Sequence, residues 1–375
     1  MAKDIYKKLA HHLDNLPGGF PSTESGVELR ILRRLFTPEE AELAIHLTLI
    51  PEEPGVIARR AKLDPEEAAL QLEKMAKKGL IFRVAHKDKA TLYMAAQYVI
   101  GIWEYHVNDL DKDLIRDMHE YIPTLLNFDT WKKAPQLRTI PVSRSVNIDR
   151  EIMTYENAEE LIRSQKKFVV APCICRREAA MSGEGCDKPV ETCLVFGLAA
   201  DYYHKNGLGR EIDQKEALEI IKKADEAGLV LQPSNAKRIV NICCCCGCCC
   251  QILKNIKHHP KPATLVSTPF TVYTNPETCK GCGICVERCQ MDALRVEDKK
   301  VVYDADRCIG CGLCVSTCPT GSLKLIRKPE PDQPVVPKNV FENYLRLGRA
   351  RGKLGPVSLA KMKIKSKIDR HSAKK

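Results

Sequence analysis

The sequence predicts an α+β protein of several domains, and three observations support this. The chain has 375 residues, and at roughly 150 residues per domain this length indicates two or three domains. All 19 cysteines lie between Cys173 and Cys318. The cysteine-free part before them combines helical patterns with short β-rich runs. The predicted segments are an N-terminal arm (1–24), a helical unit with a hairpin (25–100), a helical connector (101–165), a helical cysteine-rich domain (166–262), a small repeat domain (263–328) and a basic tail (329–375).

Residues 25–100 predict a helical unit that ends in a hairpin. Helices are expected over 27–36, from 38 onward, over 55–61 and from 65 to the stop at Gly79. Thr37-Pro38 and Asp64-Pro65, each followed by two glutamates, are typical helix starts. Two β-rich runs, 80–84 and 91–95, flank a polar turn at 86–89. This order of elements resembles a winged helix-turn-helix domain.

The start of the candidate recognition helix argues against DNA binding. Base contacts come mainly from the N-terminal part of such a helix, and here that part carries Glu66 and Glu67. Over 65–78 three glutamates are balanced by three lysines, whereas phosphate binding needs a basic face. Docking to a protein partner is therefore the preferred role for this region.

The number of cysteines and the hydropathy of the chain argue against a disulfide-bonded scaffold and against a membrane-spanning protein. An odd number of cysteines excludes a fully paired disulfide scaffold. No run of about 18 apolar residues predicts a transmembrane span, and the N-terminus lacks the apolar stretch of an export signal. We therefore expect a cytoplasmic protein whose reduced thiols serve as metal ligands or catalytic groups.

The repeat domain carries two copies of one cysteine motif. Cys279-x2-Cys282-x2-Cys285-x3-Cys289 recurs 29 residues later as Cys308-x2-Cys311-x2-Cys314-x3-Cys318-Pro319. In motifs of this kind the first three thiolates hold one cluster and the fourth ligates the other cluster. We expect one [4Fe–4S] cluster at Cys279, Cys282, Cys285 and Cys318, and a second at Cys308, Cys311, Cys314 and Cys289. Zinc sites need four ligands and do not explain two four-cysteine repeats.

The stretch 275–328 closely resembles the bacterial two-[4Fe–4S] ferredoxins. Gly281, Gly283, Gly310 and Gly312 suit loops that crowd against a cluster. Gln290 departs from the pattern, because proline commonly follows the last cysteine of the first motif. We expect this departure to alter the local loop and to leave the ligation unchanged.

A second block contains the other 11 cysteines and is harder to assign. Four are separate, Cys173, Cys175, Cys186 and Cys193, and seven fall within 243–250. Seven cysteines in eight positions cannot all face one metal, because neighbouring side chains point in different directions. One division puts a cluster at the four separate cysteines and another within 243–250. The alternatives are a catalytic cluster with spare thiolates and a set of buried, inert cysteines.

Residues 140–328 resemble a set of cysteine-rich ferredoxin-like proteins of strict anaerobes. Those proteins combine a Cys-x-Cys-Arg segment and an Ile-Cys-x-Cys-Cys-x-Cys-Cys-Cys segment with a ferredoxin domain, and here the segments are Cys173–Arg176 and Ile242–Cys250. Cys244 stands at a variable place of the pattern and is the weakest ligand candidate. The resemblance implies one or two further clusters, with ligands among Cys173, Cys175, Cys186, Cys193, Cys243, Cys245, Cys246, Cys248, Cys249 and Cys250.

The tail holds most of the positive charge of the chain. The whole chain has a formal net charge of +11, and residues 327–375 contain 14 Lys and Arg against 4 Asp and Glu. Four prolines make its beginning an extended linker, residues 340–345 could form a short amphipathic helix, and the stretch from Lys361 reads as a solvated charge run. We expect the tail to bind other redox protein subunits. Contact with a membrane surface stays open, and nucleic acid is not the expected partner.

These observations favour an iron–sulfur electron carrier of an anaerobe, working as a subunit of a larger oxidoreductase. Electrons would pass through the two ferredoxin clusters and the cysteine-rich domain. No phosphate loop, dinucleotide fingerprint or nucleophile motif indicates a stand-alone catalyst. One alternative is an iron–sulfur redox sensor that regulates transcription. Another is a reductase with a substrate-reducing cluster at Cys243–Cys250.

Overall fold

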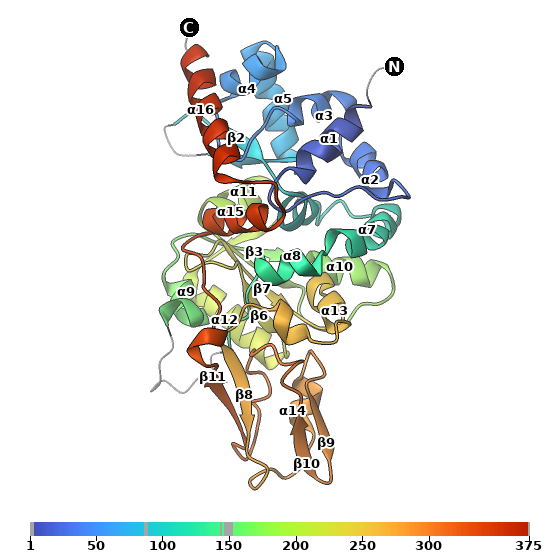
Figure 1. The fold of residues 1–375 in the computed structure, drawn as a ribbon, viewed down its shortest axis with the longest axis vertical. Helices are drawn as coiled ribbons and strands as arrows, with labels where there is room; N and C mark the ends of the chain where they lie inside the picture. Colours follow the sequence, from blue (N-terminus) through green and yellow to red (C-terminus); the bar gives the residue numbers. More distant parts are fainter. Residues whose placement is uncertain (1–3, 86–88, 143–144, 146–152, 374–375) are drawn as a thin grey trace. The chain divides into compact units, whose positions relative to one another are not determined.

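The computed structural model describes residues 4–85, 89–142, 145 and 153–373. Contacts between residues divide the chain into two units. Unit 1 comprises Met1–Ala134, Asp201–Leu208 and Tyr344–Lys375, and unit 2 comprises Pro135–Ala200 and Gly209–Asn343. Figure 1 shows the helices and strands of each unit. The six-segment division expected from the sequence stays a prediction.

Unit 1 begins with a helix in the segment that was predicted as an arm, and from residue 27 onward it has the predicted succession of helices and a hairpin. Its first helices are α1 (Ile5–Asp14), α2 (Val27–Leu35), α3 (Pro38–Ala44), α4 (Pro54–Ala61) and α5 (Pro65–Lys77). Thr37 and Glu40 form a reciprocal capping box at α3, and Asp64 accepts two backbone N–H bonds at α5. Strands β1 (Ile81–Val84) and β2 (Leu92–Ala95) pair antiparallel, whereas the predicted turn at 86–88 lies outside the described residues. The winged-helix assignment itself stays a prediction.

The rest of unit 1 is helical. It contains η1 (Tyr98–Ile102), α6 (Trp103–Tyr105), α7 (Lys112–Leu125) and α8 (Phe128–Lys133). Phe20, Tyr98 and Tyr121 form a group of edge-on aromatic contacts at its centre. Burying such large rings supplies much of the stabilisation that a helical core needs.

The C-terminal tail is more ordered than its charge suggests. It forms η5 (Glu330–Asp332), α15 (Val340–Ala350) and α16 (Pro356–Ser372). Within unit 1, Asp369 of α16 pairs with Arg60, and Ser366 donates to the buried Glu52. Lys361, Lys363, Lys365 and Lys367 are exposed, as a solvated run requires, but they stand on a helix that packs against the same chain.

A five-stranded sheet organises unit 2 and corrects the expectation of a helical cysteine-rich domain. Its strands are β3 (Phe168–Pro172), β4 (Glu191–Phe196), β5 (Arg210–Ile212), β6 (Val230–Pro233) and β7 (Asn241–Cys245). They run in the order β5-β3-β4-β7-β6, every neighbouring pair antiparallel. The strands are short, and β7 consists largely of cysteines, so the residue pattern gave little sign of a strand.

Helices connect and cover this sheet. They are α9 (Ala158–Arg163), α10 (Ile174–Met181), α11 (Gly197–Lys205), α12 (Gln214–Glu226) and α13 (Gln251–Lys257). Helix α12 packs on β3, β4 and β6, and it buries one apolar face that includes Ile220 and Ile221. Cys173 precedes α10 and Cys250 precedes α13 as N-cap residues, so cysteines mark the starts of two helices beside the sheet.

The C-terminal part of unit 2 consists of two small hairpin-like sheets. Strand β8 (Phe270–Thr274) pairs with β11 (Leu323–Arg327), and β9 (Leu294–Glu297) pairs with β10 (Lys300–Tyr303), all antiparallel. Helix α14 (Ile284–Arg288) and the short turns η3 (Thr154–Glu156) and η4 (Pro262–Leu265) complete the unit. A small core that includes Val272, Leu294 and Leu323 packs directly against cysteine side chains.

Hydropathy of the helices bears on membrane insertion. Among the residues that the structure describes, none of the helices has the length and apolar character that crossing a bilayer requires.

Candidate metal centres

The first four-cysteine set of the repeat surrounds one hollow. Cys279, Cys282, Cys285 and Cys318 all line the same pocket. The three cysteines of the first motif come from the loop before α14 and its first turn, and Cys318 arrives from the second motif. The backbone N–H of Gly281 donates to Sγ of Cys279 at 3.4 Å. Four thiols around one hollow, with backbone donors aimed at sulfur, fit an anionic iron–sulfur cluster.

The second set surrounds another hollow in the same way. Cys289, Cys308, Cys311 and Cys314 line the same pocket. Backbone N–H groups of Gly310 and Ala293 donate to Sγ of Cys308 and Cys289 at 3.4 and 3.2 Å. Each hollow therefore takes three thiols from one motif and one from the other, which is the exchange that the repeat implies.

Glycines allow these loops to approach their surroundings closely. Gly281 and Gly310 have φ of +64° and +65°, in the left-handed region. A Cβ on Gly281 would lie 2.5 Å from the carbonyl oxygen of Lys299, and one on Gly310 would lie 2.4 Å from that of Phe270. Neither position has room for a side chain.

Burial sets the protonation of the repeat thiols. It raises the pKa of Cys285 and Cys289, and it raises the pKa of Cys311 to about 12. Burial also acts on Cys318, but hydrogen bonds with Ser322 and Thr320 outweigh it and lower the pKa to about 7. Thiols that are costly to ionise alone give up their protons when a metal binds, because the metal supplies the compensating charge.

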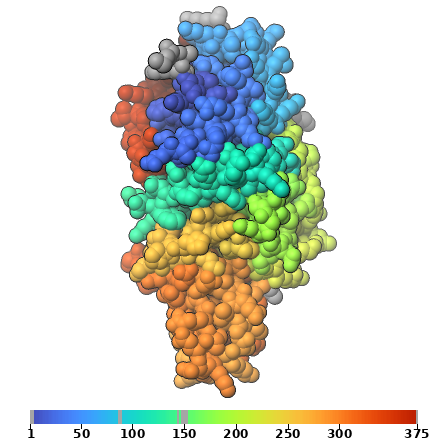
Figure 2. Space-filling view, turned by 90° about the vertical axis from the view of Figure 1, so that its right-hand side faces the viewer, coloured from blue at the N-terminus to red at the C-terminus, as the bar shows by residue number. Residues whose placement is uncertain are grey.

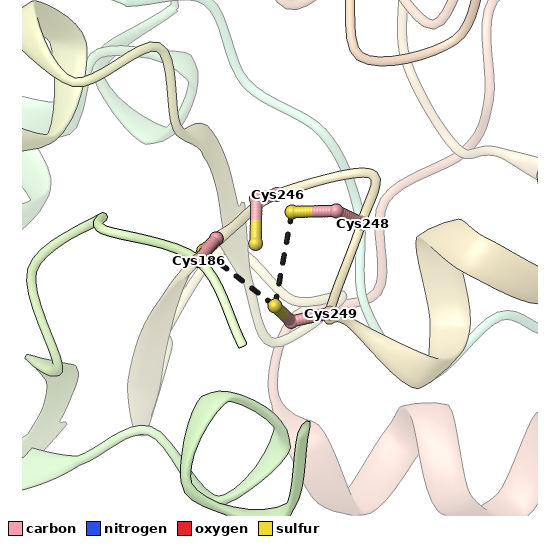
Figure 3. Close-up of side chains that lie close together, drawn as sticks. All are labelled: Cys186, Cys246, Cys248 and Cys249. Carbon is pink, nitrogen blue, oxygen red and sulfur yellow. Dashed lines mark hydrogen bonds between the residues drawn. The ribbon is translucent and has the colours of Figure 1, made fainter. Parts of the chain in front are cut away.

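In the cysteine-rich domain, four thiols form a compact cluster that we name the four-thiol group: Cys186, Cys246, Cys248 and Cys249. Their Sγ atoms all lie within 4.8 Å of one another. Cys249 lies at the centre, 3.5 Å from Cys186 and 3.7 Å from Cys248, and Figure 3 shows all four sulfurs turned toward one space. Cys246 and Cys249 are buried and Cys248 is exposed. Among the described residues, no other cysteines are grouped this tightly.

Six further thiols lie side by side in a series, which we name the six-thiol group. Its members, in order along the chain of contacts, are Cys173, Cys175, Cys250, Cys245, Cys243 and Cys193. Cys193 on β4 stands directly opposite Cys243 on β7. Hydrogen bonds from Cys193 and Cys245 hold the pKa of Cys243 well below its usual value, and those from Cys175 and Cys245 do the same for Cys250.

Side chains alternate between the two faces of strand β7, and this alternation places Cys244 apart from both groups. Cys243 and Cys245 face one side of the sheet, so Cys244 between them faces the other. It is buried, burial raises its pKa, and it belongs to neither group. The arrangement differs from the division considered from the sequence, because Cys186 lies with three cysteines of the 243–250 run and not with Cys173, Cys175 and Cys193.

A buried arginine, Arg176, lies between the two groups. It is 2% exposed and donates to the carbonyl oxygen of Cys244, Oγ1 of Thr192 and the carbonyl oxygen of Pro189. Burial opposes its charge, but Cys173 and Cys245 of one group and Cys246 of the other raise its pKa. Its place beside both groups suits a donor to cluster sulfur.

Several contacts join the cysteine-rich and repeat parts, among them the ion pair of Arg288 with Asp225 and a bond at the four-thiol loop. The N–H of Gly247, inside the four-thiol loop, donates to Oε1 of Gln290 at 2.8 Å. A Cβ on Gly247 would lie 2.3 Å from the carbonyl oxygen of Gln290. Nearby, Arg307 donates to the carbonyl oxygen of Lys257 at the end of α13, and Figure 2 shows the α13 segment directly against the repeat residues. The unusual residue after Cys289 therefore has a structural partner.

Other polar residues near the cysteines have ordinary roles. Arg210 forms exposed ion pairs with Glu191 and Glu216. Sequence reasoning missed the partnership of Gln290 with Gly247, although the replacement of proline by glutamine was a visible signal.

Comparison with known proteins supports the repeat domain alone. Residues 264–322 match the family model of the 4Fe-4S dicluster domain. No curated protein and no solved structure matches the chain significantly. The match and the cysteine sets support an iron–sulfur, ferredoxin-like domain that binds [4Fe–4S] clusters.

Proposed function

We propose that the protein transfers electrons as an iron–sulfur subunit of an anaerobic oxidoreductase complex. The observation that carries this proposal is the pair of hollows, each lined by four cysteines of the repeat, within the segment that matches a dicluster domain. Cys279, Cys282, Cys285 and Cys318 would hold one cluster, and Cys308, Cys311, Cys314 and Cys289 the other. Such clusters, when bound, accept and release single electrons.

We assign one further cluster to the six-thiol group. Six thiols that are neighbours in space provide more than the four ligands that a [4Fe–4S] cluster uses. Their positions on β4, on β7 and at the starts of α10 and α13 hold them without reliance on flexible loops. Arg176 beside them supplies positive charge in a buried place, where an anionic cluster would otherwise be unfavourable.

Anaerobic purification with iron and sulfide quantification and EPR tests this proposal. We expect about 12 cluster irons per chain, four for each cluster. Exchange of Cys318 for alanine should remove the signal of the first cluster and leave the second, although Cys318 belongs to the second motif. About eight irons would contradict the further cluster, and absence of reducible ferredoxin-type signals would contradict electron transfer itself.

One observation favours a second function, a reductase with its site at the six-thiol group. The group holds two thiols more than one cubane uses, and thiols beside a cluster could take part in reducing a substrate. A reductase predicts that a substrate speeds reoxidation of the reduced protein, and that Cys-to-Ser exchanges at Cys243 and Cys245 abolish this effect while the ferredoxin signals persist. Reoxidation rates that depend only on added redox proteins favour the electron-transfer subunit.

A further inference from the structure

The four-thiol group has a geometry unlike that of the ferredoxin sites. All four of its sulfurs lie within 4.8 Å of one another, whereas the cysteines of each ferredoxin set stand around the lining of a hollow. The same kind of side chain is thus arranged in two ways within one unit: around a space in the repeat, and in close contact in the four-thiol group (Figure 3).

The distance between the sulfur atoms depends on whether they bind one metal ion or an iron–sulfur cluster. A single ion with four thiolates at about 2.3 Å in a tetrahedron places the sulfurs about 3.8 Å apart. In a cubane each thiolate binds its own iron, so the sulfurs surround the cluster from outside at a separation of roughly 6 Å. The separations of 3.5 Å and 3.7 Å from Cys249 to its two neighbours match the single ion.

Charge supports a dianionic occupant at the four-thiol group. A divalent ion with four thiolates has a net charge of about −2. Arg176 is almost fully buried, lies beside Cys246, and has an Nε atom without a hydrogen-bond partner. A buried guanidinium needs a nearby anion, and four metal-bound thiolates beside Cys246 would supply one.

The loop topology gives such an ion a structural role. Cys246, Cys248 and Cys249 lie in the turn between β7 and α13, and the two residues that flank them, Cys245 and Cys250, belong to the six-thiol group. Cys186 comes from the separate segment between α10 and β4. An ion that joins these four thiols would close the turn and hold its two ends in place.

We propose that Cys186, Cys246, Cys248 and Cys249 bind a single tetrahedral metal ion of the thiolate-preferring class, and not an iron–sulfur cluster. The four thiols lose their protons on binding, no electron is transferred, and no sulfide is incorporated. The ion fixes the turn that presents Cys245 and Cys250. This site is additional to the proposed electron-transfer clusters and does not depend on them.

Metal and sulfide analysis of the full-length protein, isolated without oxygen, tests this proposal. We expect about one ion per chain that has no matching acid-labile sulfide. Four thiolates commonly hold either zinc or iron. A zinc ion would appear as zinc content, and a single iron ion as iron in excess of sulfide. Exchange of both Cys186 and Cys249 for alanine should remove this ion, with EPR of the ferredoxin clusters unchanged. The matched control is Cys244→Ala, a buried cysteine of the same run that belongs to neither group.

Two results would overturn the proposal. One is loss of about four irons together with about four sulfides in the Cys186 and Cys249 variant, with no single ion in the parent protein. The other comes from the unaltered protein and is independent of how the variant folds. Exchange of the bound ion for Co²⁺ in the folded, full-length protein should give the intense visible absorption of tetrahedral cobalt thiolate, and a protein with neither a single bound ion nor this absorption excludes the site. Failure of the electron-transfer proposal would instead appear in the ferredoxin signals.

Discussion

The backbone N–H of Gly247 donates to the side-chain oxygen of Gln290 at 2.8 Å, which joins the four-thiol loop to the residue after Cys289. One partner follows a proposed ligand of the second ferredoxin cluster, and the other lies between two cysteines of the four-thiol group. This is a direct connection between the ferredoxin repeat and the cysteine-rich domain, and it can be removed without touching any cysteine.

Exchange of Gln290 for methionine should weaken this connection. Methionine has a similar length but no strong acceptor, so the partly buried N–H of Gly247 loses its partner, at a cost of about 1 kcal/mol. We expect a fall of several degrees in the apparent melting temperature and altered EPR of the second ferredoxin cluster, with iron content unchanged. Gln214→Met, at an exposed glutamine of the same unit, is the control. Equal melting temperatures in both variants would contradict a structural role for Gln290.

Gly281 and Gly283 provide a matched pair near the first hollow. Both have positive φ, +64° and +80°, so alanine at either position is strained by about 1–2 kcal/mol. Only Gly281 is also crowded, since a Cβ there would meet the Lys299 backbone at 2.5 Å, whereas Gly283 has no heavy atom within 4 Å. We therefore expect Gly281→Ala to lose the first cluster selectively and Gly283→Ala to keep both.

Iron quantification and EPR of the two glycine variants measure this difference. The second hollow, lined by Cys308 and its partners, serves as the internal reference in each variant. If Gly283→Ala loses as much iron as Gly281→Ala, backbone strain alone governs the loop, and the close approach to Lys299 has no separate effect.

The grouping of the repeat cysteines around two hollows could be predicted residue by residue, whereas the grouping in the cysteine-rich domain could not. The constant spacing of the four cysteines specifies which thiols meet. The first three lie in one short loop around a cluster, and the fourth lies where it reaches the cluster of the other repeat. The position of Cys186 instead depends on how a five-stranded sheet brings distant segments together. The number of residues between Cys186 and Cys249 therefore does not predict that their side chains meet.

The fold shows the same contrast between local and distant information. Helix starts at Thr37 and Asp64 are set by neighbouring residues, and the observed caps occur there. Strand β7 pairs with β4 and β6, which lie far from each other in the sequence, and its cysteines resemble a metal motif more than a strand. The docking of α16 through Asp369 and Arg60 likewise depends on residues about 300 positions apart.

The ion pair between Arg60 and Glu52 should be important for the stability of unit 1. Glu52 is fully buried and receives two hydrogen bonds from Arg60, at 2.6 and 2.7 Å. Arg60→Met leaves that carboxylate without its counter-ion, which costs about 3–5 kcal/mol. Asp369→Asn removes a less buried partner of the same arginine and should cost about 1 kcal/mol.

Tryptophan fluorescence during denaturation measures these losses, because Trp103 and Trp131, the 2 tryptophans of the chain, both belong to unit 1. Adding Glu52→Gln to Arg60→Met should restore part of the stability, since the unpaired charge is then absent. No recovery in the double variant would show that packing of the arginine side chain, and not charge, accounts for the loss.

His12 should make unit 1 sensitive to acid. Burial lowers the pKa of His12 to about 4, and its Nε2 atom is sealed from solvent without a hydrogen-bond partner. In the unfolded chain a histidine titrates near 6.5, so between these values the unfolded state binds more protons than the folded state. Stability is therefore complete above about pH 6.5 and falls as the pH drops toward 4, by roughly 3 kcal/mol in total.

The measurement is the pH dependence of unfolding, followed by tryptophan fluorescence so that acid loss of metal from unit 2 is not the signal. His12→Gln should flatten the decline between pH 6.5 and 4, because glutamine does not titrate. His11→Gln, at the exposed neighbouring histidine of α1, should leave the wild-type slope unchanged. If the slope is the same in all three proteins, protonation of carboxylate partners such as those of Arg60 governs the acid response, and burial of His12 contributes nothing measurable.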